Sequence, residues 1–489
     1  MIPLISRSLS FQESQAIISD GKSYSYKDLL ERSDEIACYL LESNTDLNEG
    51  RVAFMVEPGF DYVAVQWGIW RAGGVAVPLC ITYPEEALLY VVEDTQAIHI
   101  IASEIYSGIA SSVATKLGTL FATVENCQAE KKSLPEVDVD RRAMILYTSG
   151  TTSKPKGVVT THKNITAQIT SLTDAWQWAS TDHILCVLPL HHVHGIINVI
   201  GSALWTGATC EFLPKFSPEG IFEKFHDGKI NLFMAVPTIY FKLITYIDAC
   251  SDTEKENIYK CLKKFRLMVS GSAALPVSVM GKWKIVSGHD LLERYGMTEI
   301  GMGISNPYEG ERRPGFIGQP LPGVSIRLTD EQDQEINGEP GEIQVKGDTV
   351  FNEYWHRPEA TSSSFTKDGW FKTGDIAELV DGSYRILGRS STDIIKSGGY
   401  KISALEIEEI IRAEKGIVDC SVVGLPDDEW GELIAAAVIT SNLFKLEELI
   451  AALKNKLPGY KMPRKFKLLS DLPRNAMGKV TKNELKKIF

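Results

Sequence analysis

Short apolar runs recur along most of the 489-residue chain, and a stretch with helical spacing separates each run from the next. Alternation of this kind is typical of a layered α/β domain, in which helices cover both faces of the sheets. The runs are RVAFMV, GGVAVPL, AIHIIAS, RAMILYTSG, HILCVLPL, NLFMAVPT and FRLMVSGSA. They predict a large domain of layered α/β subdomains.

The pattern changes near Gly341, where GEIQVKG and SYRILGR predict strands of a smaller β-rich portion. After Arg389 comes SSTDIIKSGGYKIS, a polar and Gly-rich stretch, and then an amphipathic helix from Ala404 to Glu414 with further strands beyond it. We therefore predict two domains, a large N-terminal domain over residues 1–388 and a small, mobile α+β C-terminal domain over residues 389–489.

Composition and charge exclude several classes of protein. A hydrophobic fraction of 44% supports a large core, and a net charge of -12 argues against a general nucleic-acid surface. The apolar run from Gly195 to Cys210 is shorter than the roughly 20 residues that a membrane span needs, so we expect buried core. Eight cysteines without a CxxC pair indicate reduced thiols. We expect a cytoplasmic protein without a cleavable leader, a monomer or a homodimer.

The most informative stretch is TSGTTSKPKG, from Thr148 to Gly157, directly after an apolar run. Its hydroxyls and its Gly-permitted backbone approach suit phosphate oxygens, and Lys156 adds a compact positive charge. It is not a Walker A loop, because GxxxxGK[ST] is absent. A polar surface loop is the alternative, since clusters of Ser, Thr and Gly are usual in loops.

The wider stretch YTSGTTSKPKGVVTTH is similar to the signature of the adenylate-forming superfamily, which includes acyl-CoA synthetases, luciferases and peptide-synthetase adenylation domains. Ser153 stands where the usual pattern has Gly. Further motifs follow in the family's order over essentially the whole chain. The resemblance implies an ATP-dependent acyl-CoA synthetase that uses ATP, Mg²⁺ and coenzyme A. It implies nucleotide contacts from Thr148, Ser149, Gly150, Thr151, Thr152, Lys156, Ser272, Ala273 and Gly296.

Two other motifs resemble the remaining nucleotide site. In ERYGMTE, Tyr295 would stack on adenine, Thr298 would bind phosphate and Glu299 would hold Mg²⁺, which prefers hard oxygen ligands. Asp375 in FKTGD and Arg389 would bind the ribose, because a carboxylate accepts hydrogen bonds from both hydroxyls. The plainer alternatives are a solvated Glu and a turn Asp.

The C-terminal motifs imply a two-step reaction. By resemblance, Asp393 is the hinge, and Lys396 with Gly398 and Gly399 forms the loop that lies along the pantetheine of CoA. Lys479 in PRNAMGKVTKNEL occupies the position of the adenylation lysine, which would bridge the attacking carboxylate and the α-phosphate. A lysine-rich tail is otherwise a solvated face.

The acyl pocket resembles that of malonyl-CoA synthetases in LPLHHVHGI, MAVPTIYFKLI, LMVSGSAALP and LLERYGMTEIGM. The reaction that this implies joins malonate to CoA through a malonyl-adenylate. A dicarboxylate needs a cation at the far end of its pocket, and the candidates are His194, Lys242 and Arg294. The implied acyl-site residues are His192, Val193, His194, Lys242, Arg294, Met297 and Met302.

Several alternatives stay open. Lys242 stands where the bacterial enzymes compared typically have arginine, so methylmalonate or another short acid competes with malonate. A luciferase-like oxidoreductase and a non-catalytic nucleotide-binding protein are the other classes. A zinc site at His191, His192 and His194 is a minor alternative, because no Cys or acidic fourth ligand lies nearby in the sequence.

Overall fold

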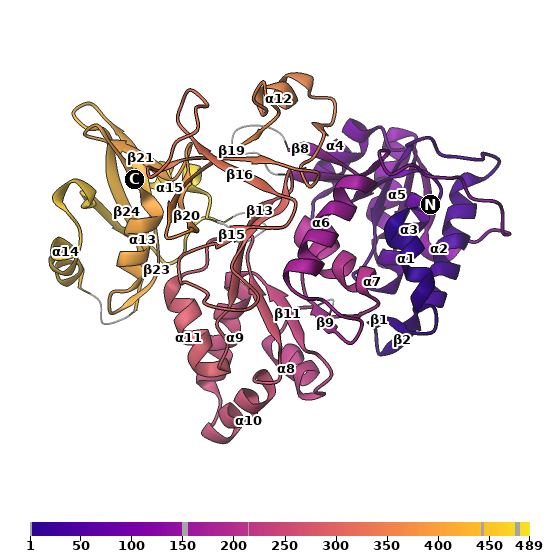
Figure 1. The fold of residues 1–489 in the computed structure, drawn as a ribbon, viewed down its shortest axis with the longest axis horizontal. Coiled ribbons are helices and arrows are strands. Elements are labelled where there is room, and N and C mark those ends of the chain that lie inside the picture. Colours follow the sequence, from indigo (N-terminus) through magenta and orange to yellow (C-terminus); the bar gives the residue numbers. More distant parts are fainter. Residues whose placement is uncertain (1, 149–154, 214, 442–444, 475–479) are drawn as a thin grey trace.

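The computed structural model describes residues 2–148, 155–213, 215–441, 445–474 and 480–489. The predictions for Ser149, Gly150, Thr151, Thr152 and Lys479 therefore lie outside the described residues. Figure 1 shows the N-terminal α/β layers on the right and in the centre, and the C-terminal part on the left. In the part of the chain that is described, no helix is both long and apolar enough to span a membrane.

Two α/β sheets form the large part of the molecule. The first contains, in spatial order, β18 (Glu353–Tyr354), β8 (Lys156–Thr161), β7 (Arg142–Thr148), β4 (Val75–Pro78), β3 (Arg51–Met55), β5 (His99–Ala102) and β6 (Leu120–Thr123). The second contains β15 (Gln319–Pro320), β14 (Gly301–Ser305), β13 (Leu292–Met297), β12 (Leu267–Ser270), β11 (Leu232–Ala235), β9 (His183–Cys186), β10 (Thr209–Phe212), β1 (Gln15–Ser19) and β2 (Lys22–Ser25). All seven apolar runs contain strands, which confirms the layered α/β prediction.

Two smaller sheets follow in the sequence. The predicted β-rich portion is a sheet of β16 (Ser325–Thr329), β17 (Gly341–Lys346), β19 (Phe371–Val380) and β20 (Ser383–Arg389). The C-terminal sheet contains β22 (Tyr400–Ser403), β21 (Ile394–Ser397), β24 (Gly431–Thr440), β23 (Ile417–Asp427) and β25 (Lys465–Leu468). The predicted boundary, between residues 388 and 389, falls at the last residue of β20 and stays a prediction.

Helices cover the sheets on both faces, as Figure 1 shows. The α-helices of the large part are α1 (Pro3–Ser8), α2 (Tyr26–Leu41), α3 (Phe60–Arg71), α4 (Glu85–Thr95), α5 (Ser107–Leu117), α6 (His162–Ala175), α7 (Ser202–Thr206), α8 (Pro218–His226), α9 (Pro237–Ala249), α10 (Asp252–Leu262), α11 (Val277–Ser287) and α12 (Pro358–Ser363). The C-terminal part carries α13 (Ala404–Arg412), α14 (Leu446–Lys454) and α15 (Lys482–Ile488). The 3₁₀ turns are η1 (Leu9–Phe11), η2 (Glu104–Tyr106), η3 (Val124–Asn126) and η5 (Gly459–Lys461).

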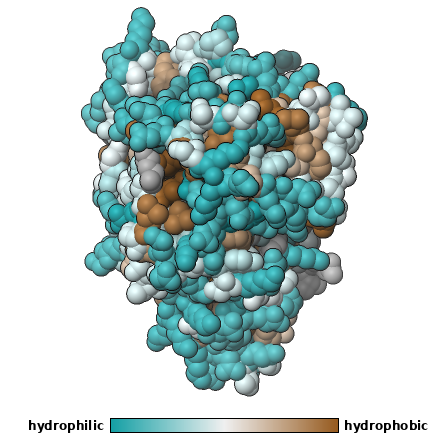
Figure 2. Space-filling model, turned by 90° about the vertical axis from the view of Figure 1, so that its right-hand side faces the viewer, coloured by the Kyte–Doolittle hydropathy of each residue, from teal (hydrophilic) through white to brown (hydrophobic). Residues whose placement is uncertain are grey.

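The run from Gly195 to Cys210 belongs to the core, as predicted. It forms most of a π-helix, η4 (His194–Gly201), then α7 and the start of β10, and its residues are almost all buried. π-Helical turns are rare and often lie at functional sites. The outer face of the N-terminal part in Figure 2 is mostly hydrophilic, with apolar residues in limited patches, as expected when the apolar runs are inside.

Candidate functional site

One large cavity, about 1770 Å³, lies where the sheets and the C-terminal part meet. The ends of β7, β11, β12 and β13 open into it through Thr148, Val236, Ser272 and Met297. Ligands of α/β sheets typically bind outside the carboxyl ends of strands. The cavity exceeds the roughly 300–1,000 Å³ of a site for one drug-sized ligand, so it has room for a nucleotide beside a small acid.

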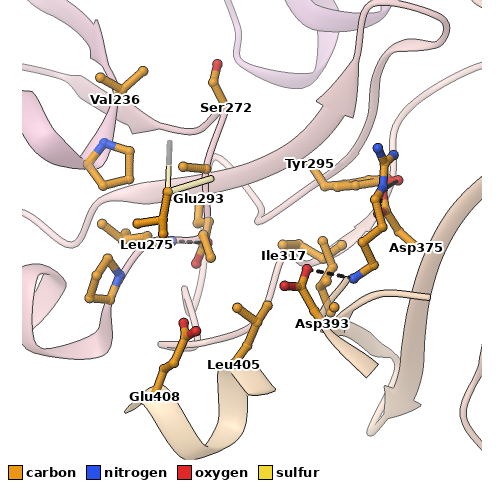
Figure 3. Close-up of a pocket in the computed structure, with 18 of the residues that line it drawn as sticks. Val236, Ser272, Leu275, Glu293, Tyr295, Ile317, Asp375, Asp393, Leu405 and Glu408 are labelled. Atoms are coloured by element: carbon orange, nitrogen blue, oxygen red, sulfur yellow. Dashed lines mark hydrogen bonds and ion pairs between the residues drawn. The ribbon is translucent and has the colours of Figure 1, made fainter. Parts of the chain in front are cut away.

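Strand pairing brings together the residues that are predicted to bind the ribose. Asp375 in β19 lies opposite Arg389 in β20, and the Arg389 Nε donates to Asp375 Oδ1 at 3.0 Å. The Tyr295 hydroxyl donates to Asp375 Oδ2 at 2.6 Å. Burial lowers the pKa of Arg389, but Asp375 outweighs it and raises this pKa above its ordinary value. These two contacts hold the Asp375 carboxylate at one end of the cavity (Figure 3).

The predicted phosphate and magnesium residues lie in the same cavity. Thr298 and Glu299 follow β13 in a turn, and Lys156 stands opposite Thr148 in the register of β7 and β8. Tyr354 joins them, because its hydroxyl donates to Glu299 Oε1 at 2.9 Å while the Lys156 ammonium lies 5.0 Å from its ring centroid. Sequence reasoning missed Tyr354, which belongs to no motif and reaches the site only through the pairing of β18 with β8.

A capped helix fixes this corner of the site. The Thr161 hydroxyl accepts from the Asn164 backbone N–H at 3.1 Å, and the side-chain Oδ1 of Asn164 accepts from the Thr161 backbone N–H at 2.9 Å. This capping box starts α6 directly after β8. The Asn164 amide also donates to the backbone oxygens of Asp348 and Val350, which ties the segment before β18 to the same helix.

The acyl end contains most of the predicted residues. His192, Val193 and His194 line the cavity at the start of η4, together with Met297 and Met302. His194 Nδ1 lies 3.1 Å from the Ser272 hydroxyl, and Ser272 has a backbone φ of +68°, a left-handed conformation that is uncommon for a residue with a side chain. Burial, then Arg294 and His192, lower the pKa of His194 well below its ordinary value, so this imidazole is neutral.

Arg294 is the buried cation of this end. It is 3% exposed, lines the cavity, and its Nε and Nη2 atoms have no hydrogen-bond partner among the described residues. Burial lowers its pKa to about 9, which leaves the guanidinium charged at neutral pH. A Cβ on Gly271 would lie 2.4 Å from the Arg294 Cζ, so only glycine leaves room for this side chain. A buried charge without a partner is costly, which indicates that an anion completes the site.

The structure does not bring Lys242 into the cavity. Phe241 and Ile244 of α9 line the cavity, whereas Lys242 is exposed and its ammonium lies 5.3 Å from the ring centroid of Phe216. Successive residues of a helix point about 100° apart, so Lys242 is turned away when Phe241 faces inward. Lys242 therefore does not lie where a far-end anchor for a dicarboxylate is needed, and Arg294 does.

Glu293 is a second buried group that sequence reasoning left without a role. Its Oε1 accepts from the Leu275 backbone N–H at 2.9 Å, and burial raises its pKa to about 8 (Figure 3). It therefore holds a proton at neutral pH. The charge of Arg294, the next residue on the strand, acts in the opposite direction and lowers the pKa of Glu293.

The predicted CoA loop lies away from this cavity. Lys396, Gly398 and Gly399 are exposed and do not line it, whereas the predicted hinge residue Asp393 does. Gly398 and Gly399 have φ values of +56° and +83°, so glycine suits the turn between β21 and β22. Ala273 and Gly296 line the cavity, as expected of nucleotide contacts.

No arrangement for zinc is visible in the described ranges. Among those residues, no group of three or more His, Cys, Asp or Glu side chains could hold a metal ion. His191 instead lies 6.0 Å from Tyr83, ring centroid to ring centroid, and burial lowers its pKa to about 4.

The comparisons with known proteins agree with this geometry. Residues 7–355 match the model of the AMP-binding enzyme family, and residues 406–479 match that of the AMP-binding enzyme C-terminal domain. The chain belongs to the AMP-binding enzyme family. The malonate–CoA ligase ACSF3, mitochondrial, of Homo sapiens is 43% identical over 100% of this chain and 92% of its own length. The malonate–CoA ligase of Arabidopsis thaliana is 41% identical over 96% of this chain and 86% of its own length.

Solved structures of the family show the same fold. The ATP-bound MatB from Rhodopseudomonas palustris is 33% identical, covers 100% of this chain and 99% of its own, and superposes with a TM-score of 0.91. The apo form of that protein gives 0.84 over the same shares. The large α/β part with a small C-terminal part, predicted from the sequence, is therefore the fold of this family.

Proposed function

We propose that this AMP-binding enzyme is a malonate–CoA ligase, which converts ATP, malonate and CoA into malonyl-CoA, AMP and diphosphate. The observation that carries the proposal is the buried guanidinium of Arg294, whose Nε and Nη2 have no partner among the described residues at the acyl end of the cavity. The single carboxylate of a monocarboxylic acid reacts at the α-phosphate, so no second carboxylate is left to pair with this charge. A dicarboxylate pairs it through charge-assisted hydrogen bonds.

The first step joins the acid to the nucleotide. One malonate oxygen attacks the α-phosphorus of ATP, a P–O bond forms, and the bond to the bridging oxygen breaks as diphosphate leaves. Asp375 and Tyr295 hold the nucleoside at one end, while Arg294 holds the far carboxylate at the other. Fixing both reactants in line supplies much of the rate, because reaction within one complex avoids the entropy of encounter. We assign the cation that bridges carboxylate and phosphate to Lys479, as the sequence predicts.

Mg²⁺ fits the residues at the phosphate end. Thr298 and Glu299 supply a hydroxyl and a carboxylate, the hard oxygen donors that this cation prefers. Bound there with the phosphates, it would neutralise the charge that gathers on the departing diphosphate. Tyr354 orients the Glu299 carboxylate for this role through its 2.9 Å hydrogen bond.

The second step forms the thioester. The CoA sulfur attacks the acyl carbon, the bond from that carbon to the AMP oxygen breaks, and the thiol proton passes to solvent. The turn at Gly398 and Gly399 lies outside the cavity in this pose, so we propose that the C-terminal part turns about Asp393 to bring it in.

An acid panel tests the proposal. Diphosphate release from ATP is measured without CoA for malonate, methylmalonate, succinate and acetate side by side. We expect the highest kcat/KM with malonate. A preference for methylmalonate or acetate would replace the substrate assignment and keep the ligase, whereas no diphosphate release with any acid would refute the ligase.

For the place in the cell, we propose the cytoplasm, as the sequence predicts; the eight free cysteines suit a reducing compartment. The human relative is named mitochondrial, so fractionation of cells that express the full chain tests the assignment. Recovery with a matrix marker would contradict it.

A further inference from the structure

The Asp393 carboxylate bridges two parts of the chain. On one side its Oδ2 accepts from the Arg389 backbone N–H at 2.9 Å, at the end of β20. On the other side its Oδ1 lies 2.7 Å from the Lys482 ammonium, at the start of α15, and Figure 3 marks an ion pair at Asp393. One side chain therefore holds both the strand before the predicted hinge and the last helix of the C-terminal part.

Lys482 is buried between two acids. Its ammonium also lies 3.0 Å from Glu408 Oε1, and the side chains of Lys482, Asp393 and Glu408 are 10%, 17% and 4% exposed. Burial alone would lower the pKa of Lys482, but Glu408 and Asp393 outweigh it and raise this pKa above its ordinary value. Removing one partner therefore leaves a buried charge uncompensated.

The segments before and after residues 475–479 are both held by ion pairs of the C-terminal part, through Arg474 on one side and Lys482 on the other. Arg412 pairs with Glu408 and Asp419 at 3.2 Å each, and Arg474 pairs with Asp419 at 2.5 Å. Arg474 and Val480 also form an antiparallel bridge.

Close packing holds the Asp393 side chain in place. A Cβ on Gly388 would lie 2.4 Å from the Asp393 Cβ, and Gly388 has a φ of +132°, which disfavours any other residue. The Asp393 backbone oxygen accepts from the Ala404 backbone N–H at 2.8 Å, at the start of α13. The Cβ and the backbone oxygen of Asp393 are therefore held by segments on both sides of the hinge.

A rotation about the backbone of Asp393 moves Arg389 relative to Lys482. The carboxylate cannot keep both partners through such a rotation, so the double contact belongs to one pose. In this pose Arg474, Val480 and Lys482 line the cavity that contains Tyr295 and Asp375. The better superposition on ATP-bound MatB, 0.91 against 0.84 for the apo form, agrees with a pose that receives the nucleotide.

We propose that Lys482 is a positioning residue for the adenylation half-reaction. Its ion pair with the hinge carboxylate stabilises the pose in which the chain on both sides of residues 475–479 faces the nucleotide, and this pair parts when the CoA loop turns in. The inference rests on the proposed ligase function.

The test separates the two half-reactions. Adenylation is measured as malonate-dependent exchange of labelled diphosphate into ATP, and thioester formation as the reaction of supplied malonyl-adenylate with CoA. For Lys482→Met we expect exchange to fall about ten- to hundredfold, the range for one charge-assisted hydrogen bond, and thioester formation to stay within about threefold. Lys482→Arg keeps the charge and should recover most of the exchange.

The matched control is Lys487→Met on the same helix, because Lys487 is 70% exposed and pairs with Glu484 of α15 itself. It should match the wild type in both half-reactions. If Lys482→Met does not fold, Lys482→Met combined with Glu408→Gln removes the uncompensated buried acid and is measured instead. Equal loss of both half-reactions, or no loss of exchange, overturns the proposal. Absence of exchange in the wild type with every acid refutes the ligase function itself.

Discussion

Replacing Arg294 by Met tests whether Arg294 or Lys242 binds the far carboxylate of malonate. The change removes two guanidinium nitrogens that have no hydrogen-bond partner in the described part of the chain, from a side chain that is 3% exposed, and it keeps an unbranched side chain. A hydrogen bond to a charged group contributes about 1.5–3 kcal/mol. Loss of about 3 kcal/mol corresponds to a decrease on the order of a hundredfold in kcat/KM for malonate, at about 1.36 kcal/mol for each factor of ten.

The assay compares malonate with acetate, which has no far carboxylate. Initial rates of diphosphate release give kcat/KM for each acid, and the effect should fall on malonate alone. In the absence of ligand, the variant should unfold at a higher temperature than the wild type, because an unpaired buried charge is costly. Lys242→Met is the matched control and should change malonate activity less than about twofold, since Lys242 is exposed and outside the cavity.

Three outcomes would refute this reasoning. One is an equal loss for malonate and acetate, which would mean that Arg294 supports the fold and not the far carboxylate. A second is unchanged malonate activity in the Arg294 variant. The third is loss of malonate selectivity in the Lys242 variant, which would restore the lysine as the anchor.

Three further changes test other parts of the site. Gly271→Ala places a Cβ 2.4 Å from Arg294 Cζ and should lower malonate kcat/KM about tenfold while acetate is spared; an equal effect on both acids would contradict the packing argument. Tyr354→Phe removes the hydrogen bond to Glu299 and should raise the Mg²⁺ concentration needed for half-maximal diphosphate release several-fold, at about 1 kcal/mol for one hydrogen bond; an unchanged Mg²⁺ dependence would exclude the orienting role. Burial raises the pKa of Glu293 from 4.5 to about 8, so between these pH values the folded protein holds a proton that the unfolded chain releases. The stability that this group contributes is therefore lost as the pH rises through that range. The unfolding temperature should fall more steeply from about pH 5 to about pH 8 in the wild type than in Glu293→Gln, and parallel curves would contradict the raised pKa.

Local sequence patterns predicted most of the fold and the nucleotide end. The apolar runs contain the strands, and Thr148, Met297 and Arg389, each part of a motif, lie at strand ends that line one cavity. These strands belong to three different sheets, so the sequence predicts each strand end, and the fold brings the ends together.

Contacts between segments that are distant in the sequence could not be predicted from local patterns. Tyr354 reaches Glu299 only because β18 pairs with β8, and Lys482 reaches Asp393 across most of the C-terminal part. The sequence offered His194, Lys242 and Arg294 as the carboxylate anchor and favoured Lys242, whereas the structure places Arg294 and not Lys242 in the cavity. For Lys242 the direction of the side chain depends on which side of α9 packs inward, and a mixed helix such as this one shows it only in the fold.

The account as a whole depends on an acyl-adenylate between malonate and malonyl-CoA, and oxygen labelling tests this most directly. The enzyme is incubated with malonate whose carboxylate oxygens are ¹⁸O, together with ATP, Mg²⁺ and CoA. The masses of the products are then measured by mass spectrometry. The account predicts malonyl-CoA, one labelled oxygen in AMP and none in diphosphate. Formation of ADP, unlabelled AMP, or the absence of malonyl-CoA would contradict it.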